Sequence, residues 1–195
     1  MSETSDKRRR ADLDLFILTL VDQGVSTPYA MQKLASLSQG ATNPALQRLL
    51  DAGFLFQGKP GARRRRDYRV SASGKRLLRD GWLPLLEAGG SGDVDADLRV
   101  ALLAISADGN PRRAADYMMQ SADRIEESIE AMEPALDINE TPPIAKLYNE
   151  LRFSAAKTML SAKAKALRSM ADSIARHPGR KSGRGKATPR KRTAR

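Results

Sequence analysis

The segment GFLFQGKPGARRRRDYRV, residues 53–70, decides the fold because it joins two short strand-like runs through a turn. The runs Phe54–Phe56 and Tyr68–Val70 contain the aromatic and β-branched residues that favour strands. The Pro-Gly pair at 60–61 supplies the turn, since proline fixes the first central backbone angle and glycine accepts the second. Four arginines, Arg63–Arg66, follow this pair. The segment therefore predicts a β-hairpin whose tip carries clustered positive charge.

A short helical segment, NPALQRLLDAG at 43–53, comes directly before the hairpin. Asn43 can cap the free amides at a helix start, and Pro44 at the first helical position loses no hydrogen bond. The pattern predicts a helix over 44–52, although a start at Ser38 would also keep the proline in a tolerant early turn. A helix followed by a basic hairpin is typical of a winged helix. DNA binding is the leading hypothesis that this layout supports.

The remaining elements are marked by capping residues, prolines and glycines. Thr27-Pro28, Asn110-Pro111 and Thr141-Pro142 each predict a helix start. The expected helices span 12–23, 28–36, 44–52, 72–81, 94–107, 111–133 and 142–176. The Gly-Gly-Ser-Gly run at 89–92 indicates a flexible linker between two domains.

The expected fold is mainly α with a small β-hairpin: an N-terminal winged helix-turn-helix followed by a helical C-terminal dimerisation domain. The predicted organisation is a basic N-terminal arm (1–11), a DNA-binding domain (12–88), a linker (89–93), a dimerisation domain (94–176) and a basic, disordered tail (177–195). The last helix carries an apolar stripe and would be on the order of 50 Å long at 1.5 Å per residue. Because it would overhang two shorter neighbours, we expect a second subunit to cover it. The stripe consists of Ile144, Leu147, Leu151, Ala155, Met159, Ala162, Ala166, Met170 and Ile174.

Charge and composition restrict the class of function. The net charge is +11, and the tail from Arg176 to Arg195 has nine basic residues and no acid. In contrast, residues 93–175 are net acidic, which indicates that only part of the chain meets a polyanion. The chain has no cysteine and one histidine, and we see no carboxylate pair in apolar sequence, so we expect neither an enzyme nor a cofactor. No apolar run reaches membrane-spanning length, and a cytoplasmic protein is expected.

The candidate DNA-binding residues lie on the third helix and the hairpin. Asparagine and glutamine can pair with an adenine edge, and arginine with guanine or a phosphate. Hairpin cations would contact the backbone or a narrow minor groove. The basic tail would add non-specific phosphate binding. The candidates are Thr42, Asn43, Gln47, Arg48, Lys59, Arg63, Arg64, Arg65, Arg66 and Arg69.

The chain resembles the PadR family of bacterial transcription regulators over roughly residues 12–87. The resemblance is carried by LDLFILTLVDQGVSTPYAMQKL, by PALQRLLDAGFL at 44–55, and by YRVSASG at 68–74. It implies a dimeric winged-helix repressor whose helical second domain pairs the subunits, and some relatives hold a planar ligand between their domains. The chain departs from the family at Asn43, where a tyrosine is usual, and at Thr27-Pro28, where His-Gly is usual.

Two other interpretations remain open. A nucleoid-associated or architectural protein would bind duplex DNA through the hairpin and tail with little sequence preference. Alternatively, the winged helix would be a protein-interaction module whose tail binds RNA or acidic partners. No residue of the chain specifies a small-molecule effector.

Overall fold

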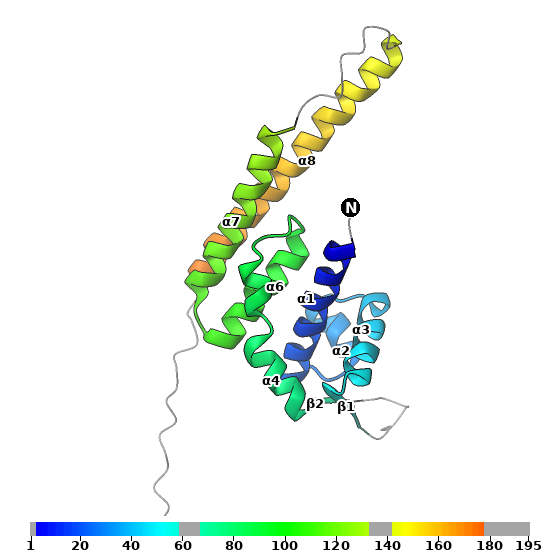
Figure 1. Ribbon diagram of the computed structural model, residues 1–195, viewed down its shortest axis with the longest axis vertical. Helices are drawn as coiled ribbons and strands as arrows, with labels where there is room; N and C mark the ends of the chain where they lie inside the picture. The colour runs from blue at the N-terminus through cyan, green and yellow to red at the C-terminus, as the bar shows by residue number, and fades with distance from the viewer. Residues whose placement is uncertain (1–2, 59–66, 133–141, 178–195) are drawn as a thin grey trace, which may run out of the picture.

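The computed structural model describes residues 3–58, 67–132 and 142–177, and it is mainly helical with a small antiparallel sheet, as expected (Figure 1). Within the described residues, no helix has the length and apolar character needed to cross a membrane. The elements in chain order are α1 (Glu3–Asp22), α2 (Pro28–Ala35), α3 (Gln39–Asp51), β1 (Leu55–Gln57), β2 (Tyr68–Val70), α4 (Ala72–Asp80), α5 (Leu83–Glu87), α6 (Val94–Asp108), α7 (Pro111–Glu130) and α8 (Pro143–Ala175).

The first helix begins earlier than expected, because the predicted N-terminal arm is part of α1. Two of its arginines have partners between Leu85 and Asp93. Arg8 donates through Nη2 to the carbonyl oxygens of Leu85 and Gly89, and Arg9 pairs with Asp93. The basic cluster near the N-terminus therefore binds α1 to the segment that precedes α6.

Two hydrophobic cores flank α1, which lies between α6 and the α2–α3 pair (Figure 1). Ile17 and Leu18 belong to the first core, whereas Leu15 belongs to the second. The first core also contains Met31, Ala45, Leu46, Leu49, Leu55 and Tyr68. Because one helix contributes to both cores, the two predicted domains share α1 instead of meeting only through a linker.

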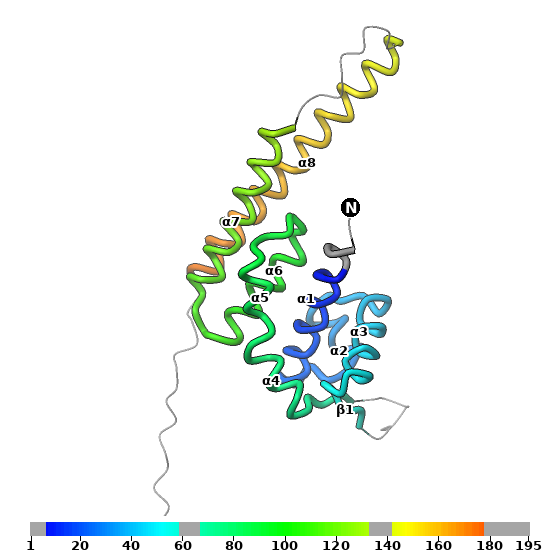
Figure 2. The backbone as a smooth tube through the Cα atoms, in the orientation of Figure 1, coloured from blue at the N-terminus to red at the C-terminus, as the bar shows by residue number. Residues whose placement is uncertain are grey.

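The second core lies among α5, α6, α7 and α8, and Figure 2 shows α5 beside α6. The short helix α5 was not predicted; it contributes Leu85, and Trp82 packs just before it. On α7, Ala115, Met118, Ala122 and Ile125 are buried, and steps of three and four residues separate them. On α6, the buried residues are Ala96, Asp97, Val100, Ala101, Leu103 and Ala104, while Leu102 is exposed.

The predicted flexible linker is closely packed against α7. Gly89 is buried and has a φ of +74°, a conformation that glycine adopts without steric cost. A Cβ atom on Gly90 would lie 2.3 Å from the Cβ of Ser121. Arg124 also donates to the carbonyl oxygens of Ala88 and Gly90, each at 3.2 Å. These glycines allow the backbone to approach α7, and they do not form a flexible hinge.

The carboxylate of Asp97 holds this junction together. It is fully buried and accepts hydrogen bonds from the backbone N–H of Ser91 at 2.7 Å, the backbone N–H of Gly92 at 3.1 Å and the Ser91 hydroxyl at 2.9 Å. From α7 it also accepts hydrogen bonds from the hydroxyls of Tyr117, at 2.9 Å, and Ser121. Burial and this neighbouring carboxylate raise the pKa of Tyr117. A buried charge with a full set of donors thus links the segment before α6, α6 itself and α7.

The projecting end of α8 extends beyond α7 (Figure 1). At 1.5 Å per residue, α8 is about 50 Å long and α7 about 30 Å. The buried residues of α8 are all in its second half, namely Ala164, Leu167, Ala171 and Ile174. Ile174 of the predicted stripe packs into the second core, whereas Ala162 and the stripe members in the first half of α8 are exposed, so its coverage by a second subunit stays a prediction.

The donors around Asp97 give a stability prediction. Asp97→Asn replaces one oxygen by an amide that cannot accept, so that at least one buried donor is left without a partner. We expect the free energy of unfolding to fall by about 2 kcal/mol or more, measured by urea denaturation with circular dichroism. Asp95→Asn, on the exposed side of the same turn, is the control and should cost under about 1 kcal/mol. Equal losses of stability in the two variants would contradict the role given to Asp97.

Candidate nucleic-acid-binding surface

The α2 and α3 helices each begin at a side-chain hydroxyl that caps the first turn, and a short turn joins them. The Thr27 side chain accepts from the amide of Ala30 at 3.2 Å, and Pro28 occupies the first turn of α2. Ser36, with a φ of 54°, ends α2. Ser38 then caps α3 by accepting from the amide of Ala41 at 3.2 Å. The earlier of the two starts that the sequence allowed is therefore the one adopted.

Burial divides α3 into two faces. Thr42, Ala45, Leu46 and Leu49 are buried against the first core, whereas Asn43 and Gln47 are exposed. Thr42 donates its hydroxyl to the carbonyl of Ser38 at 2.8 Å. The prediction of Thr42 as a groove contact is wrong, because the earlier helix start turns this position toward the core.

Arg48 is bound to a carboxylate of α1 in the free protein. Its Nε donates to Asp14 Oδ2 at 3.0 Å and its Nη2 to Asp14 Oδ1 at 2.5 Å, which is the bidentate geometry of a strong arginine–carboxylate pair. The hydrogen bond with Asp14 raises the pKa of Arg48 above its usual value. This residue therefore positions α3 on α1.

Gln39 is an exposed polar residue of α3 that the sequence-based prediction missed. It lies four residues before Asn43, and Gln47 lies four residues after, so these three amides share one helix face. Gln39 donates to the Gln32 side chain of α2 at 3.2 Å, and Gln47 donates to Asp51 at 2.7 Å. The capping position of Ser38 was the signal that would have included Gln39 in the helix.

The two strands pair antiparallel with Phe56 opposite Arg69. Both side chains are exposed, and Phe56 is 63% exposed, while Leu55 and Tyr68 face the first core. The side chain of Arg69, a predicted DNA contact, is therefore accessible to a partner. The other predicted hairpin cations, Lys59 and Arg63–Arg66, lie outside the described residues. The tail from 178 onward lies outside them as well.

A second ion pair on α1 connects this half of the chain to α6. Arg99 donates through Nε to Asp12 Oδ2 at 2.8 Å, while Asp12 Oδ1 is buried without a hydrogen-bond partner among the described residues. Burial raises the pKa of Asp12 above its usual value, against the lowering effect of Arg99. Asp12 on α1 therefore pairs with Arg99 on α6, and Asp14 on α1 pairs with Arg48 on α3, so α1 is joined by an ion pair to each of these helices.

A groove of about 820 Å³ lies where α1, α2 and α6 meet. Its lining includes Leu20 and Leu37, which pack against the first core, and Leu98 and Ile105, which pack against the second. Its walls are mainly apolar, with Arg99 and Asp95 among the lining residues. The apolar lining includes Phe16, Leu20, Leu34, Leu37, Leu98 and Leu102.

The Arg48–Asp14 pair predicts energetic coupling between α3 and α1. A double-mutant cycle with Asp14→Ala and Arg48→Ala should give a coupling energy of about 0.5–1 kcal/mol from urea unfolding, because the pair is bidentate but partly exposed. The same cycle with Asp14→Ala and exposed Arg69→Ala is the control and should be additive. Additivity in the first cycle would show that the pair does not hold α3 in place.

Comparison with known proteins adds no relative from which a function could be transferred. No protein-family model matches the chain, and no curated protein matches it. The interpretation of this surface therefore depends on its own chemistry: an exposed row of amides on α3, and a hairpin with an exposed arginine and a run of four more in its sequence.

Proposed function

We propose that this chain is a sequence-specific, double-stranded DNA-binding transcriptional regulator of the PadR type, which acts as a dimeric repressor in the bacterial cytoplasm. In this proposal α2, α3 and the β1–β2 hairpin form a winged helix. The exposed face of α3 enters the major groove, and the hairpin contacts the neighbouring backbone or minor groove. The observation that carries the proposal is the exposed amide face of α3 beside a hairpin whose sequence holds Arg63–Arg66.

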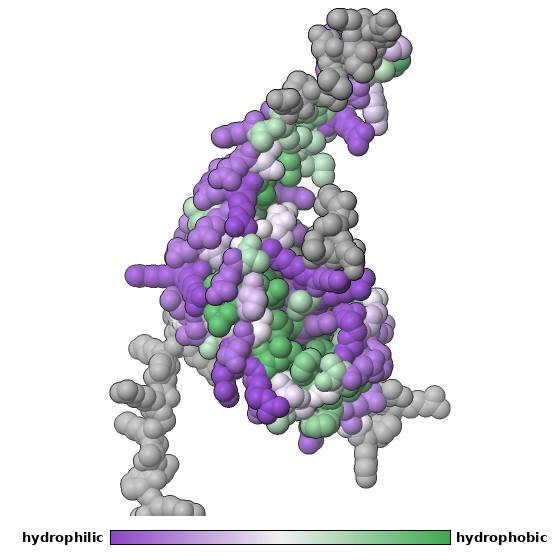
Figure 3. Space-filling view, in the orientation of Figure 1, coloured by the Kyte–Doolittle hydropathy of each residue, from purple (hydrophilic) through white to green (hydrophobic). Residues whose placement is uncertain are grey.

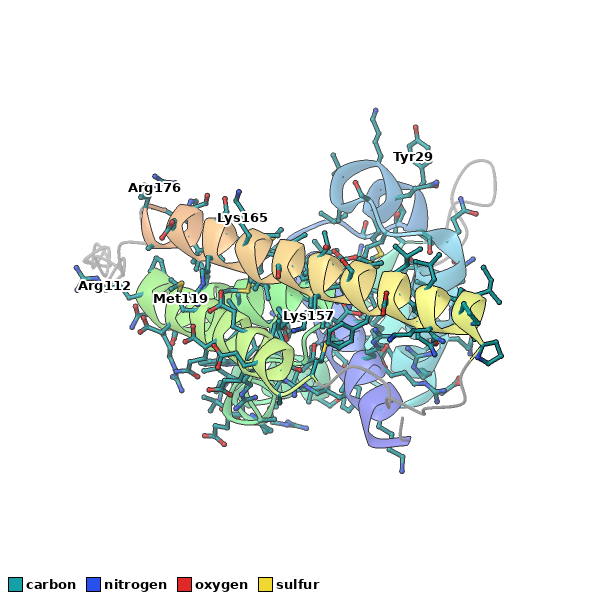
Figure 4. The ribbon with its side chains drawn as sticks, turned by 90° about the horizontal axis from the view of Figure 1, so that it is seen from above. Tyr29, Arg112, Met119, Lys157, Lys165 and Arg176 are labelled. Atoms are coloured by element: carbon teal, nitrogen blue, oxygen red, sulfur yellow. The ribbon has the colours of Figure 1, made fainter. Side chains whose placement is uncertain are left out.

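The shape of the molecule is compatible with this arrangement. Tyr29 on α2 extends away from the body, on the side of the molecule that carries α3 (Figure 4). Arg112, Lys165 and Arg176 are instead carried by the α7–α8 pair (Figure 4). Arg69 is exposed on β2, so exposed basic residues occur on the hairpin as well as on the α7–α8 pair, and their contributions to DNA binding can be compared.

The second function that an observation favours is architectural DNA binding. The tail, residues 177–195, has eight lysines and arginines and no acid, which is a composition suited to phosphate contacts without base recognition. Titration against a specific and a scrambled duplex, with and without residues 177–195, separates the two functions. A regulator should discriminate between the duplexes with or without the tail, whereas an architectural protein should discriminate in neither case.

A dimer is proposed because the projecting half of α8 exposes a continuous apolar face. Ile144 is 75% exposed and Leu151 is 62% exposed, and apolar residues are visible along this projecting end (Figure 3). Single exposed apolar residues are ordinary, but a row at helical spacing marks an interaction surface. The face consists of Ile144, Leu147, Tyr148, Leu151 and Met159.

Replacing Arg63–Arg66 with alanine tests the hairpin. We expect weaker duplex binding and a smaller slope of log affinity against log salt concentration, by up to about 0.9 for each phosphate that the hairpin no longer neutralises. Fluorescence anisotropy at several salt concentrations measures this slope. The control removes four cations elsewhere, with Arg112, Lys163, Lys165 and Arg176 each changed to alanine. An unchanged slope in the hairpin variant would overturn the assignment of the hairpin.

Charges placed in the apolar face of α8 test the dimer. We expect the unmodified chain to have a dimeric mass at micromolar concentration and the Leu147→Glu, Leu151→Glu variant a monomeric one, because burying unpaired carboxylates is costly. Analytical ultracentrifugation measures both masses. Asn149→Glu, an exposed position on the same turns, should remain dimeric. A monomeric mass for the unmodified chain would refute the dimer.

A further inference from the structure

The exposed face of α3 presents three amide side chains at regular spacing. Gln39, Asn43 and Gln47 follow one another at four-residue intervals, so neighbouring members are about 6 Å apart along the helix axis. All three are exposed, and the opposite face of the helix packs into the first core. Any partner that meets α3 from outside meets these carboxamides first.

This face lacks an available cation. Arg48 is the one basic residue between Gln39 and Asp51, and two of its nitrogens are bound to Asp14. The acidic residue of the helix, Asp51, lies at its end and accepts a hydrogen bond from Gln47. Arginine and lysine are the usual readers of guanine, which presents two acceptors in the major groove. The face is therefore poorly suited to guanine.

The amides have the complementary pattern for adenine. The adenine edge presents one acceptor, N7, and one donor, N6, and a carboxamide offers one N–H donor group and one oxygen acceptor. Two of the three amides are also held by neighbours: Gln39 donates to Gln32 on α2, and Gln47 donates to Asp51. Each of these bonds uses one amide hydrogen and leaves the second hydrogen and the oxygen for a base.

We infer that α3 selects A·T base pairs in the major groove, with Gln39 as a specificity-determining residue beside Asn43 and Gln47. The inference rests on the proposed DNA-binding function and adds the class of sequence that is read. Gln32 is a positioning residue, because it acts on the DNA only through Gln39. Affinity that does not depend on sequence comes from the cations of the hairpin, among which Arg69 is exposed on β2.

The experiment is selection of bound duplexes from a randomised pool with the full-length chain, followed by affinity measurements on the selected site. We expect adenines at the recognised positions. Gln39→Ala, Asn43→Ala and Gln47→Ala should each lower the preference for adenine at one position by about tenfold. Because no charge is removed, the salt dependence should stay the same. Gln32→Ala should lower the preference at the position assigned to Gln39 and at no other.

Gln120→Ala, an exposed amide on α7, is the matched control and should leave every preference unchanged. Selection of G·C-rich sites would overturn the inference, as would a base preference that survives the triple amide variant. Duplex binding without any base preference would overturn it while leaving DNA binding intact and favouring the architectural function. Failure to bind any duplex at low salt would overturn both the inference and the proposed function.

Discussion

The buried carboxylate of Asp97 is the interaction on which the arrangement of the two halves depends. A charge in the interior is stable only when hydrogen-bond donors replace its lost hydration. Here those donors come from the backbone of Ser91 and Gly92 and from three hydroxyls, two of them on α7. Because Gly90 has no Cβ atom, the backbone can approach Ser121 closely enough for these donors to reach the carboxylate. The segment between α5 and α6 is therefore fixed, and the second half of the chain has a defined position.

The helix α1 connects this junction to the candidate DNA-binding surface, because its side chains contact both. Arg8 reaches the carbonyls of Leu85 and Gly89 beside the Asp97 cluster and also donates to Tyr117 at 3.2 Å. Farther along α1, Asp12 pairs with Arg99 on α6 and Asp14 with Arg48 on α3. One helix thus links the exposed amides of α3 to the α6–α8 bundle. In a dimer formed through α8, this linkage would fix the separation between the two copies of α3.

The sequence predicted local structure well and tertiary contacts poorly. Capping pairs such as Thr27-Pro28 and Asn110-Pro111 marked helix starts correctly because they act within one turn. The same reasoning took Gly89-Gly90 as flexible, since no local pattern shows that α7 approaches these residues. Arg8 was placed in a basic N-terminal arm and Arg48 among the DNA contacts, because their partners are 81 and 34 residues away in the chain. The exposed site residues Asn43 and Arg69 could be predicted, whereas Gln39 required the true start of α3.

Hydrogen exchange of the full-length chain, with and without a bound duplex, tests the central claim most directly. It reports on each part of the backbone and needs no substitution. If α3 and the hairpin contact DNA, the duplex should slow exchange in residues 39–47 and in β1 and β2, and leave the projecting part of α8 unchanged. Slower exchange confined to residues 177–195, with α3 and the hairpin unaffected, would contradict the account.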